Sequence, residues 1–449
     1  MDATKVLSEF VYNLKFEDLT EHDLDYTKLL ILDYYAAVYA GIKVNRVFNK
    51  ANETVVFANG GTAESSVINS NKKLPAMSAS YMNAVYAHGA DMDDGHRKAM
   101  GHVAAHIMPS VFALAETLNV SGREVITAIA AGYEIYIRVA AAAQPGLVHR
   151  GFHSTGTAGA VACAAACAKL LRLNEEGIYN AMAVSVTQAS GLMIIAESGQ
   201  MIKPINPAKA AQTGILSALL VKNGVEGGVM PLDSKKGWFH AMTDSVDYSM
   251  ITNDLGRKLQ ISTSYFKPYP SCRHTHCGIE AAVNLNGRFN YRDITEVNLY
   301  IYKNAIQIAG QIVVPKTPDD SKFSIHYSLA CAIINGGYTL DDLDTSKNPE
   351  AVDLTSKIHL IEDETMENRD KGIRGAKLEI KLSDGRILTN TVLIPKGDPE
   401  NAFTLEDMKT KMDGCTVGIL SAEQQKDLFD YVLGLDNIGK FYLWNNVNE

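Results

Sequence analysis

The sequence lacks the cysteine and metal-binding patterns that would place it in a specialised class. Its 449 residues contain six cysteines and no C-x-x-C pair, which argues against a disulfide framework or a structural zinc site. Reduced thiols fit better. Neither an H-E-x-x-H motif nor an EF-hand loop is present, and no cysteine spacing is typical of an iron–sulfur cluster.

An excess of positive charge is also missing. The formal net charge is −9 and the isoelectric point is near 5.8, which argues against a nucleic-acid partner. The N-terminus carries acidic residues and has no long apolar segment, so no signal peptide is predicted. The most apolar run, residues 158–171, is too short to span a bilayer. We therefore expect a cytoplasmic protein that contacts no membrane, and any anionic substrate must find a local cationic pocket.

The length and composition predict an ordinary globular protein with two domains. Apolar residues make up 46% and charged residues 21% of the chain, and 449 residues exceed one compact core. Up to about residue 260 the apolar spacing is helical, with no clear alternating strand. The glycines at 151–159 do not form G-x-G-x-x-G and follow no strand, so a dinucleotide site is not expected. The helices predicted here span residues 24–42, 76–90, 103–118, 121–143, 160–171, 174–188 and 208–222.

The pattern changes after Tyr265. Period-two alternation predicts strands at 296–303, 376–382 and 386–392, the last two joined by the hairpin signal Ser383-Asp384-Gly385. Helical patterns at 276–285 and 324–335 lie between the strands, and those at 404–413 and 421–434 are expected to pack back on the first domain. The predicted fold is mostly α: a large all-helical domain of residues 1–265 plus 396–449, and a smaller α+β domain of residues 266–395.

Residues 88–102 concentrate carboxylates and imidazoles between two helical patterns. Asp91 and His102 stand at the edges of apolar runs, and a carboxylate that orients an imidazole is a recurrent acid–base device. A metal site is an alternative, because both residue types are ligands. For the residues between them a second interpretation stays open, a solvated charge cluster at a helix end formed by Asp93, Asp94, Arg97 and Lys98.

Four more candidates lie further along the chain. His153 precedes a predicted helix N-terminus, which favours an anion, although capping or packing is the alternative. Lys203, in the polar loop 197–207, stands between Gly199 and two prolines, so its stem has little freedom. Lys267 and Arg273 supply fixed positive charge in a segment held by two prolines, and arginine suits bidentate carboxylate binding. A Cys/His metal knot there would lack a second ligand pair.

Taken together, these motifs resemble the MmgE/PrpD family, which includes 2-methylcitrate dehydratases, cis-aconitate decarboxylase and iminodisuccinate epimerase. The resemblance covers nearly the whole chain. It comprises the D-x-D-D segment with Asp91, the H-x6-P segment with His102 and Pro109, Gly151-Phe-His-x-Thr-Gly-Thr157, the Lys203 loop, Lys267-Pro-Tyr-Pro-x-Cys-Arg-His-Thr-His276, Phe323-Ser-x-x-Tyr327 and Lys396-Gly-Asp-Pro-Glu-Asn401.

The resemblance implies a helical domain with an α+β lid, a site between them, a homodimer, and a polycarboxylate substrate handled without metal or other cofactor. The implied site positions are Asp91, His102, His153, Lys203, Lys267 and Tyr327. Three residues depart from the pattern. Val103 follows His102 where Pro is usual, Gly95 stands where Thr is frequent, and Cys272 replaces a His of the decarboxylase branch, which disfavours that branch.

The expected function is a lyase that removes a proton next to a carboxylate and then eliminates water, as 2-methylcitrate dehydratase does. Lys203, Lys267 and Arg273 would bind and stabilise the carboxylates. His153 or His102 would take the proton, and the other histidine or Tyr327 would protonate the departing hydroxyl. The alternatives are an epimerase or a decarboxylase of the same family, and a non-catalytic polycarboxylate-binding protein.

Overall fold

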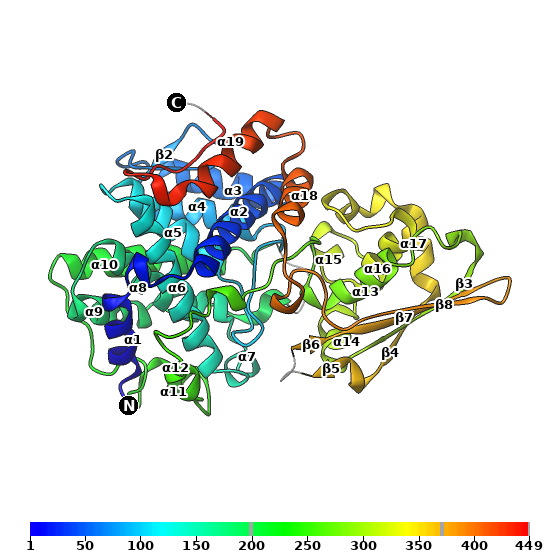
Figure 1. The fold of residues 1–449 in the computed structure, drawn as a ribbon, viewed down its shortest axis with the longest axis horizontal. Helices are drawn as coiled ribbons and strands as arrows, with labels where there is room; N and C mark the ends of the chain where they lie inside the picture. Colours follow the sequence, from blue (N-terminus) through cyan, green and yellow to red (C-terminus); the bar gives the residue numbers. More distant parts are fainter. Residues whose placement is uncertain (197–200, 369–371, 448–449) are drawn as a thin grey trace.

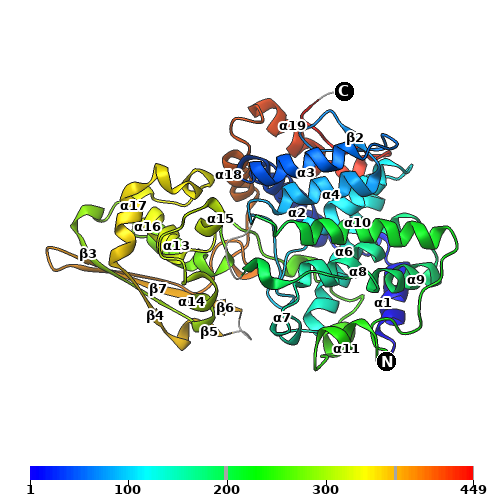
Figure 2. The same cartoon turned by 180° about the vertical axis from the view of Figure 1, so that it is seen from behind.

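The computed structural model describes residues 1–196, 201–368 and 372–447. Helices account for 57% of the chain and strands for 9%, so the predicted mostly-α fold is confirmed. Figure 1 shows a large helical unit beside a smaller unit that contains the main sheet, and Figure 2 shows the same division from behind. The helical unit comprises α1 to α12, α18 and α19, and the smaller unit, here called the lid, comprises α13 to α17 and β3 to β8.

The helical unit is built from both ends of the chain. Its helices are α1 Ala3–Asn13, α2 Glu21–Val44, α3 Arg46–Ala58, α4 Ala76–His88, α5 Ala104–Glu116, α6 Gly122–Ala142, α7 Gly146–His149, α8 Ser154–Leu170, α9 Glu175–Val186, α10 Ile205–Lys222, α11 Trp238–Met242, α12 Ser249–Thr252, α18 Leu405–Thr416 and α19 Ala422–Leu433. As expected, α18 and α19 pack on α2.

Helix α8 lies at the centre of this unit. It packs against α5, α6, α9 and α10, and all its residues except Lys169 are buried. Its run of Ala, Gly and Cys keeps the side chains short, so neighbouring backbones approach closely and still fill the space. The sequence predicts a helix over residues 160–171, and α8 begins six residues earlier, at Ser154.

Helix α6 begins at a capping box, at the start of the predicted helix 121–143. The Ser121 side chain accepts from the Glu124 N–H, and the Glu124 carboxylate accepts from the Ser121 N–H at 2.8 Å. By length and composition α6 could cross a membrane, but the apolar window that qualifies it is wholly buried inside the protein. It is therefore a core helix.

Helix α2 runs slightly past residue 42, the predicted end of this helix. Gly41 lies against α4, and a Cβ built on it would stand 1.8 Å from the carbonyl oxygen of Tyr86 and 3.3 Å from the Cα of Gly89. Glycine is present because two helix backbones meet here. The helix then continues to Val44.

We expect Gly41→Ala to destabilise the protein by about 1–3 kcal/mol, because the clash is with backbone that cannot rotate away. Gly414→Ala in α18 is the matched control, since nothing lies within 4 Å of its Cβ position. There the higher helix propensity of alanine should leave stability equal or raise it by up to about 1 kcal/mol. Urea denaturation of both variants measures the difference, and equal midpoints would contradict the close approach.

The lid contains a four-stranded sheet covered by helices. The strands are β3 Ile294–Ile301, β4 Ile358–Glu362, β7 Ala376–Leu382 and β8 Ile387–Val392, in the order β4-β3-β7-β8, with β3 parallel to β4 and the other pairs antiparallel. The helices are α13 His276–Val283, α14 Lys303–Ala309, α15 Pro318–Ser321, α16 Ile325–Asn335 and α17 Pro349–Leu354, and a further hairpin pairs β5 Glu367–Asn368 with β6 Ile373–Arg374.

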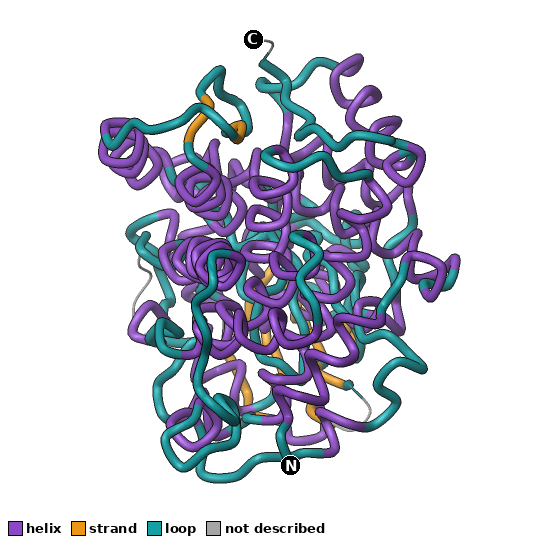
Figure 3. The backbone as a smooth tube through the Cα atoms, turned by 90° about the vertical axis from the view of Figure 1, so that its left-hand side faces the viewer, coloured by secondary structure: helices purple, strands orange, loops and turns teal. Residues whose placement is uncertain are grey.

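Each unit has its own hydrophobic core. One core gathers buried side chains from Ala3 to Phe266 and from Phe403 to Trp444, and the other gathers those from Cys277 to Val392. This division supports the proposed domains, whose boundaries stay a prediction. The first domain is not entirely helical, because β1 Ser65–Ser66 pairs with β2 Lys73–Leu74. In Figure 3 these strands lie near the top, apart from the sheet seen behind the helices.

Candidate active site

A cavity of about 160 Å³ lies between the two units. It is smaller than the roughly 300–1,000 Å³ typical of sites for drug-sized ligands, and so suits a small molecule. The helical unit and the segment that follows it contribute Asp91, His96, Met100, Gly101, His102, Val148, His153, Met193, Ile195, Lys203, Tyr265 and Lys267, and the lid contributes Cys272, Arg273, His274, Asn304, Ile308, Phe323 and Arg374.

The loop between α4 and α5 supplies the floor of the cavity. Asp91 and Met100 have positive φ values of 56° and 51°, a left-handed conformation that aspartate tolerates better than most residues. Asp94 caps the N-terminus of α5 by accepting from the N–H groups of Val103 at 3.2 Å and Ala104 at 2.8 Å. This cap joins the middle of the loop to the start of α5 and fixes the position of Asp94.

Asp91 binds two lysines from distant parts of the chain. Its Oδ1 lies 2.5 Å from the Nζ of Lys203 and 3.1 Å from the Nζ of Lys267, and Lys267 also donates to the Asp91 carbonyl at 2.7 Å. Burial by itself raises the pKa of Asp91, but the two ammonium groups outweigh it and hold this pKa well below its ordinary value. One carboxylate against two ammonium groups leaves one net positive charge beside the cavity.

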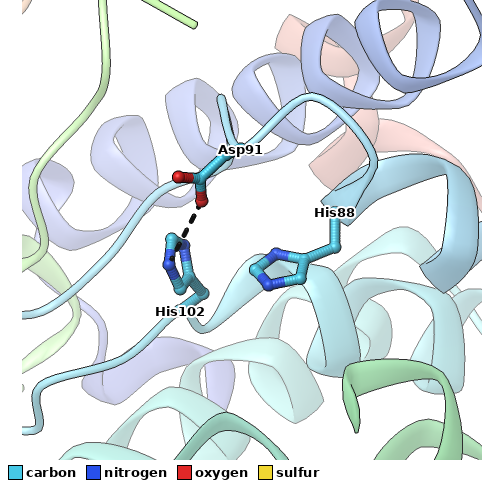
Figure 4. A group of neighbouring side chains, drawn as sticks. All are labelled: His88, Asp91 and His102. Carbon is cyan, nitrogen blue, oxygen red and sulfur yellow. Dashed lines mark ion pairs between the residues drawn. The ribbon is translucent and has the colours of Figure 1, made fainter. Parts of the chain in front are cut away.

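Asp93 joins two histidines. Its Oδ2 lies 2.8 Å from Nδ1 of His88 and 3.2 Å from Nδ1 of His102, and Figure 4 shows His88 beside the Asp91–His102 pair. Burial by itself raises the pKa of Asp93, but the imidazoles of His102 and His88 hold it well below the ordinary value. Burial lowers the pKa of His88 to about 4. At neutral pH His88 is thus uncharged and donates to an ionised Asp93.

The Nε2 of His102 faces both a hydrogen-bond donor and an acceptor. Its Nδ1 faces two acceptors, Asp93 and the carbonyl oxygen of Asp94 at 2.9 Å, and so carries a hydrogen. Its Nε2 lies 3.5 Å from the Nζ of Lys203 and 3.6 Å from the Oδ1 of Asp91. A neutral ring accepts from the lysine, and a protonated ring donates toward the aspartate. Both states of His102 therefore have a partner, as a general acid or base requires.

His153 has the opposite arrangement. Its Nδ1 accepts from the Nδ2 of Asn206 at 2.9 Å, and the same amide nitrogen also faces the Leu192 carbonyl at 3.4 Å, so the imidazole hydrogen is on Nε2. Burial and then the charge of Lys203 hold the pKa of His153 well below the ordinary value. At neutral pH His153 is an N–H donor that lines the cavity.

The cluster does not fit a divalent metal ion. In the described part of the chain, His88, Asp91 and His102 place one possible ligand atom each within 4.8 Å of one another. The ammonium groups of Lys203 and Lys267 already contact the Asp91 carboxylate, and an added dication would stand a few ångströms from both. The His88 Nδ1 is also engaged with Asp93. Repulsion from these two ammonium groups therefore opposes the binding of a divalent cation at the cluster.

The remaining candidates differ from their predicted roles. Arg273 lines the cavity, but its Nη2 lies 2.8 Å from Oδ1 of Asp398, so its charge is already paired. Tyr327 lies outside the cavity lining and is buried in the lid core, where its hydroxyl donates to the carbonyl of Asp342 at 2.8 Å. Part of the predicted Lys203 loop, residues 197–200, falls outside the described residues.

The solvated-cluster interpretation of the central segment is wrong for its aspartates. Asp93 and Asp94 are completely buried, whereas Lys98 is exposed and Arg97 pairs with Glu400. The sequence indicates a polar cluster here, since three carboxylates lie between two histidines. The contacts of these carboxylates depend on how the loop folds, which the sequence pattern does not show. The sequence places His88 only within the cluster of carboxylates and imidazoles at 88–102. No sequence pattern indicates Tyr265 or Arg374 as site residues.

Comparison with known proteins agrees with this fold. The model of the MmgE/PrpD N-terminal domain matches residues 5–251, and that of the MmgE/PrpD C-terminal domain matches residues 269–437. The chain belongs to the MmgE/PrpD family and is an enzyme of that type.

Two cis-aconitate decarboxylases match over most of their length, and a probable 2-methylcitrate dehydratase over about half. A cis-aconitate decarboxylase of Aspergillus terreus is 28% identical, covering 97% of this chain and 94% of the relative. The human cis-aconitate decarboxylase is 24% identical, covering 97% and 92%. A probable 2-methylcitrate dehydratase of Saccharomyces cerevisiae is 24% identical over 50% of this chain and 47% of its own.

Proposed function

We propose that this protein is a metal-independent lyase that acts on a small polycarboxylate, with decarboxylation of a cis-aconitate-like acid as the first candidate reaction. The observation that supports it best is the setting of His102, whose Nδ1 is held by Asp93 and whose Nε2 has a partner in either protonation state. Proton transfer at a substrate carbon needs such a group. The homodimer and the cytoplasmic location remain predictions.

Substrate binding is assigned to the lysines. A carboxylate of the substrate would lie against Lys203 and Lys267, whose combined charge exceeds that of Asp91 by one. The His153 Nε2–H would donate to the same ligand. Charge that builds on this carboxylate during the reaction then meets cations already in place, which is the strongest form of electrostatic stabilisation.

Decarboxylation needs one proton. In an unsaturated tricarboxylate of this kind, the bond between a methylene carbon and its carboxylate breaks and CO₂ leaves. The bond's electron pair forms a new double bond to the central carbon, and the electrons of the former double bond take a proton at its far carbon. Protonated His102 would deliver that proton from Nε2 and regain one from solvent. The product is an unsaturated dicarboxylate.

Dehydration would use the same atoms in reverse roles. Neutral His102 would take the proton from the carbon beside a carboxylate, and an acid would protonate the departing hydroxyl. The partial match to a probable 2-methylcitrate dehydratase supports this second candidate. Decarboxylation ranks first because the relatives matched over nearly the whole chain carry the decarboxylase name, which outweighs the argument from Cys272.

Proton NMR in D₂O with EDTA tests the proposal. We expect cis-aconitate to disappear with loss of CO₂ and with deuterium on the carbon that receives the proton, at a rate that the chelator does not change. An alkene formed from 2-methylcitrate or citrate would instead identify a dehydratase, and deuterium exchange into iminodisuccinate an epimerase. No change in any of the four acids would contradict the lyase and favour a binding protein.

A further inference from the structure

Most cations around the cavity already have a carboxylate partner. Lys203 and Lys267 share Asp91, and Arg273 is paired with Asp398. Arg374 also lines the cavity. Among the described residues, which exclude 197–200, 369–371 and 448–449, the Arg374 guanidinium has no ion-pair or hydrogen-bond partner. Glu367 is the cross-strand neighbour of Arg374 in the β5–β6 hairpin. The charge of Arg374 is therefore available to a ligand.

The backbone of Arg374 is held in place from two sides. The Sγ of Cys277 in α13 donates to the Arg374 carbonyl at 3.0 Å, and the Nη1 of Arg97 donates to the carbonyl of Gly372 at 2.9 Å. Arg374, His96 and Met100 line both the site cavity and an adjoining cavity of about 520 Å³. Arg374 thus stands where the two spaces meet.

Tyr265 brings a second polar group to the same place. Its ring occupies the space beside Gly95, where an added Cβ would lie 2.4 Å from the tyrosine hydroxyl, and the two residues exchange backbone hydrogen bonds of 3.0 and 2.7 Å. The guanidinium carbon of Arg273 lies 4.9 Å from the ring centroid. In the described part of the chain no residue accepts from the Tyr265 hydroxyl, and Tyr265 is among the residues that line the cavity. Because burial raises the pKa of Tyr265, it remains a donor.

We propose that Arg374 and Tyr265 bind a second carboxylate of the substrate, distinct from the one held by Lys203 and Lys267, and thereby select a tricarboxylate over a dicarboxylate. A guanidinium with free N–H groups fits a carboxylate in the bidentate manner, and the tyrosine adds one O–H donor. Gly95 is part of this subsite, because a side chain there would displace the Tyr265 ring. The inference rests on the proposed substrate class and adds the residues that bind the second carboxylate of the substrate.

Isothermal titration calorimetry with unreactive acids tests it. Tricarballylate carries three carboxylates, and glutarate and 2-methylsuccinate each lack one of them. We expect Arg374→Met to weaken tricarballylate binding about tenfold or more, because a charge-assisted contact is lost. For the dicarboxylate that lacks the carboxylate bound by Arg374, the affinity should change by at most about threefold. Tyr265→Phe should weaken tricarballylate binding by about two- to tenfold.

The control is Lys98→Met, which removes an exposed cation from the adjoining cavity. Because exposed charges contribute little, the affinity for each acid should stay within about twofold of the wild-type value. Arg374→Lys keeps the positive charge but loses the bidentate geometry of the guanidinium. Its affinity for tricarballylate should lie between those of the wild type and Arg374→Met. Circular dichroism shows that each variant is folded.

If Arg374→Met lost affinity equally for all three acids, or lost none, the subsite would be overturned while the lyase proposal stayed intact. A wild-type protein that binds tricarballylate but turns over none of the NMR substrates would refute the proposed reaction and leave the subsite. A wild-type protein that binds no tricarboxylate overturns both.

Discussion

Replacing His102 by Gln should lower kcat by about 10²–10⁴-fold, the usual contribution of one general acid–base group. Gln can still donate through its amide to Asp93 or to the Asp94 carbonyl, which His102 contacts at 3.2 and 2.9 Å, so the loop should keep its shape. It cannot accept or release a proton at the position of Nε2. Steady-state kinetics on the substrate identified by NMR measures the loss.

His359→Gln is the matched control for this result. His359 is exposed on β4, away from the cavity lining, so the same chemical change there should leave kcat unaltered. Thermal unfolding followed by circular dichroism establishes that both variants are folded. A His102→Gln enzyme with kcat within a few-fold of wild type would remove this residue from the mechanism and move the proton transfer to another group.

Replacing Asp93 by Asn should lower kcat by about 10²–10³-fold, because Asp93 acts through the imidazole that transfers the proton. Its carboxylate is completely buried between His88 and His102. The neutral amide keeps the size and removes the anion that stabilises a protonated ring. Because decarboxylation uses the protonated ring, the alkaline limb of the pH profile of kcat should therefore move to lower pH, a shift that a purely structural defect would not cause.

The double variant separates these possibilities. If Asp93 works only by positioning and charging His102, then Asp93→Asn should cost little further activity once His102 is already Gln, and the two losses should be strongly non-additive. Fully additive losses, with an unmoved pH profile, would show that Asp93 affects activity by another route, such as the packing of His88.

Much of the fold was predictable because local patterns agree with the tertiary structure. Strand β7 alternates buried and partly exposed residues from Ala376 to Leu382, which are the residues predicted from period-two spacing. The capping box at Ser121 marked the start of α6 correctly. Strand β4 and helix α3 were missed. β4 is the partner of β3 in a parallel pair, and its burial pattern shows no strict alternation.

The site was predictable only in part. Asp91, His102, His153, Lys203 and Lys267 all line one cavity, as their motifs suggested, whereas the Tyr327 hydroxyl is bonded inside the lid. Their catalytic roles stay predictions. Arg273 was recognised as a cation, but its partner Asp398 lies 125 residues away along the chain. No spacing rule connects such a pair, so its neutralisation could not be foreseen.

The sequence by itself determined the residue types, the helical and strand periods, and the family resemblance, because these depend on neighbours within a few turns of chain. Only the tertiary structure decided which charges cancel and which remain. Asp91 meets Lys203 and Lys267, and Asp93 meets two imidazoles. In the described chain Arg374 forms no ion pair, although Glu367 lies opposite it in the β5–β6 hairpin. Electrostatic energy depends on distance and burial in three dimensions, and folding sets both.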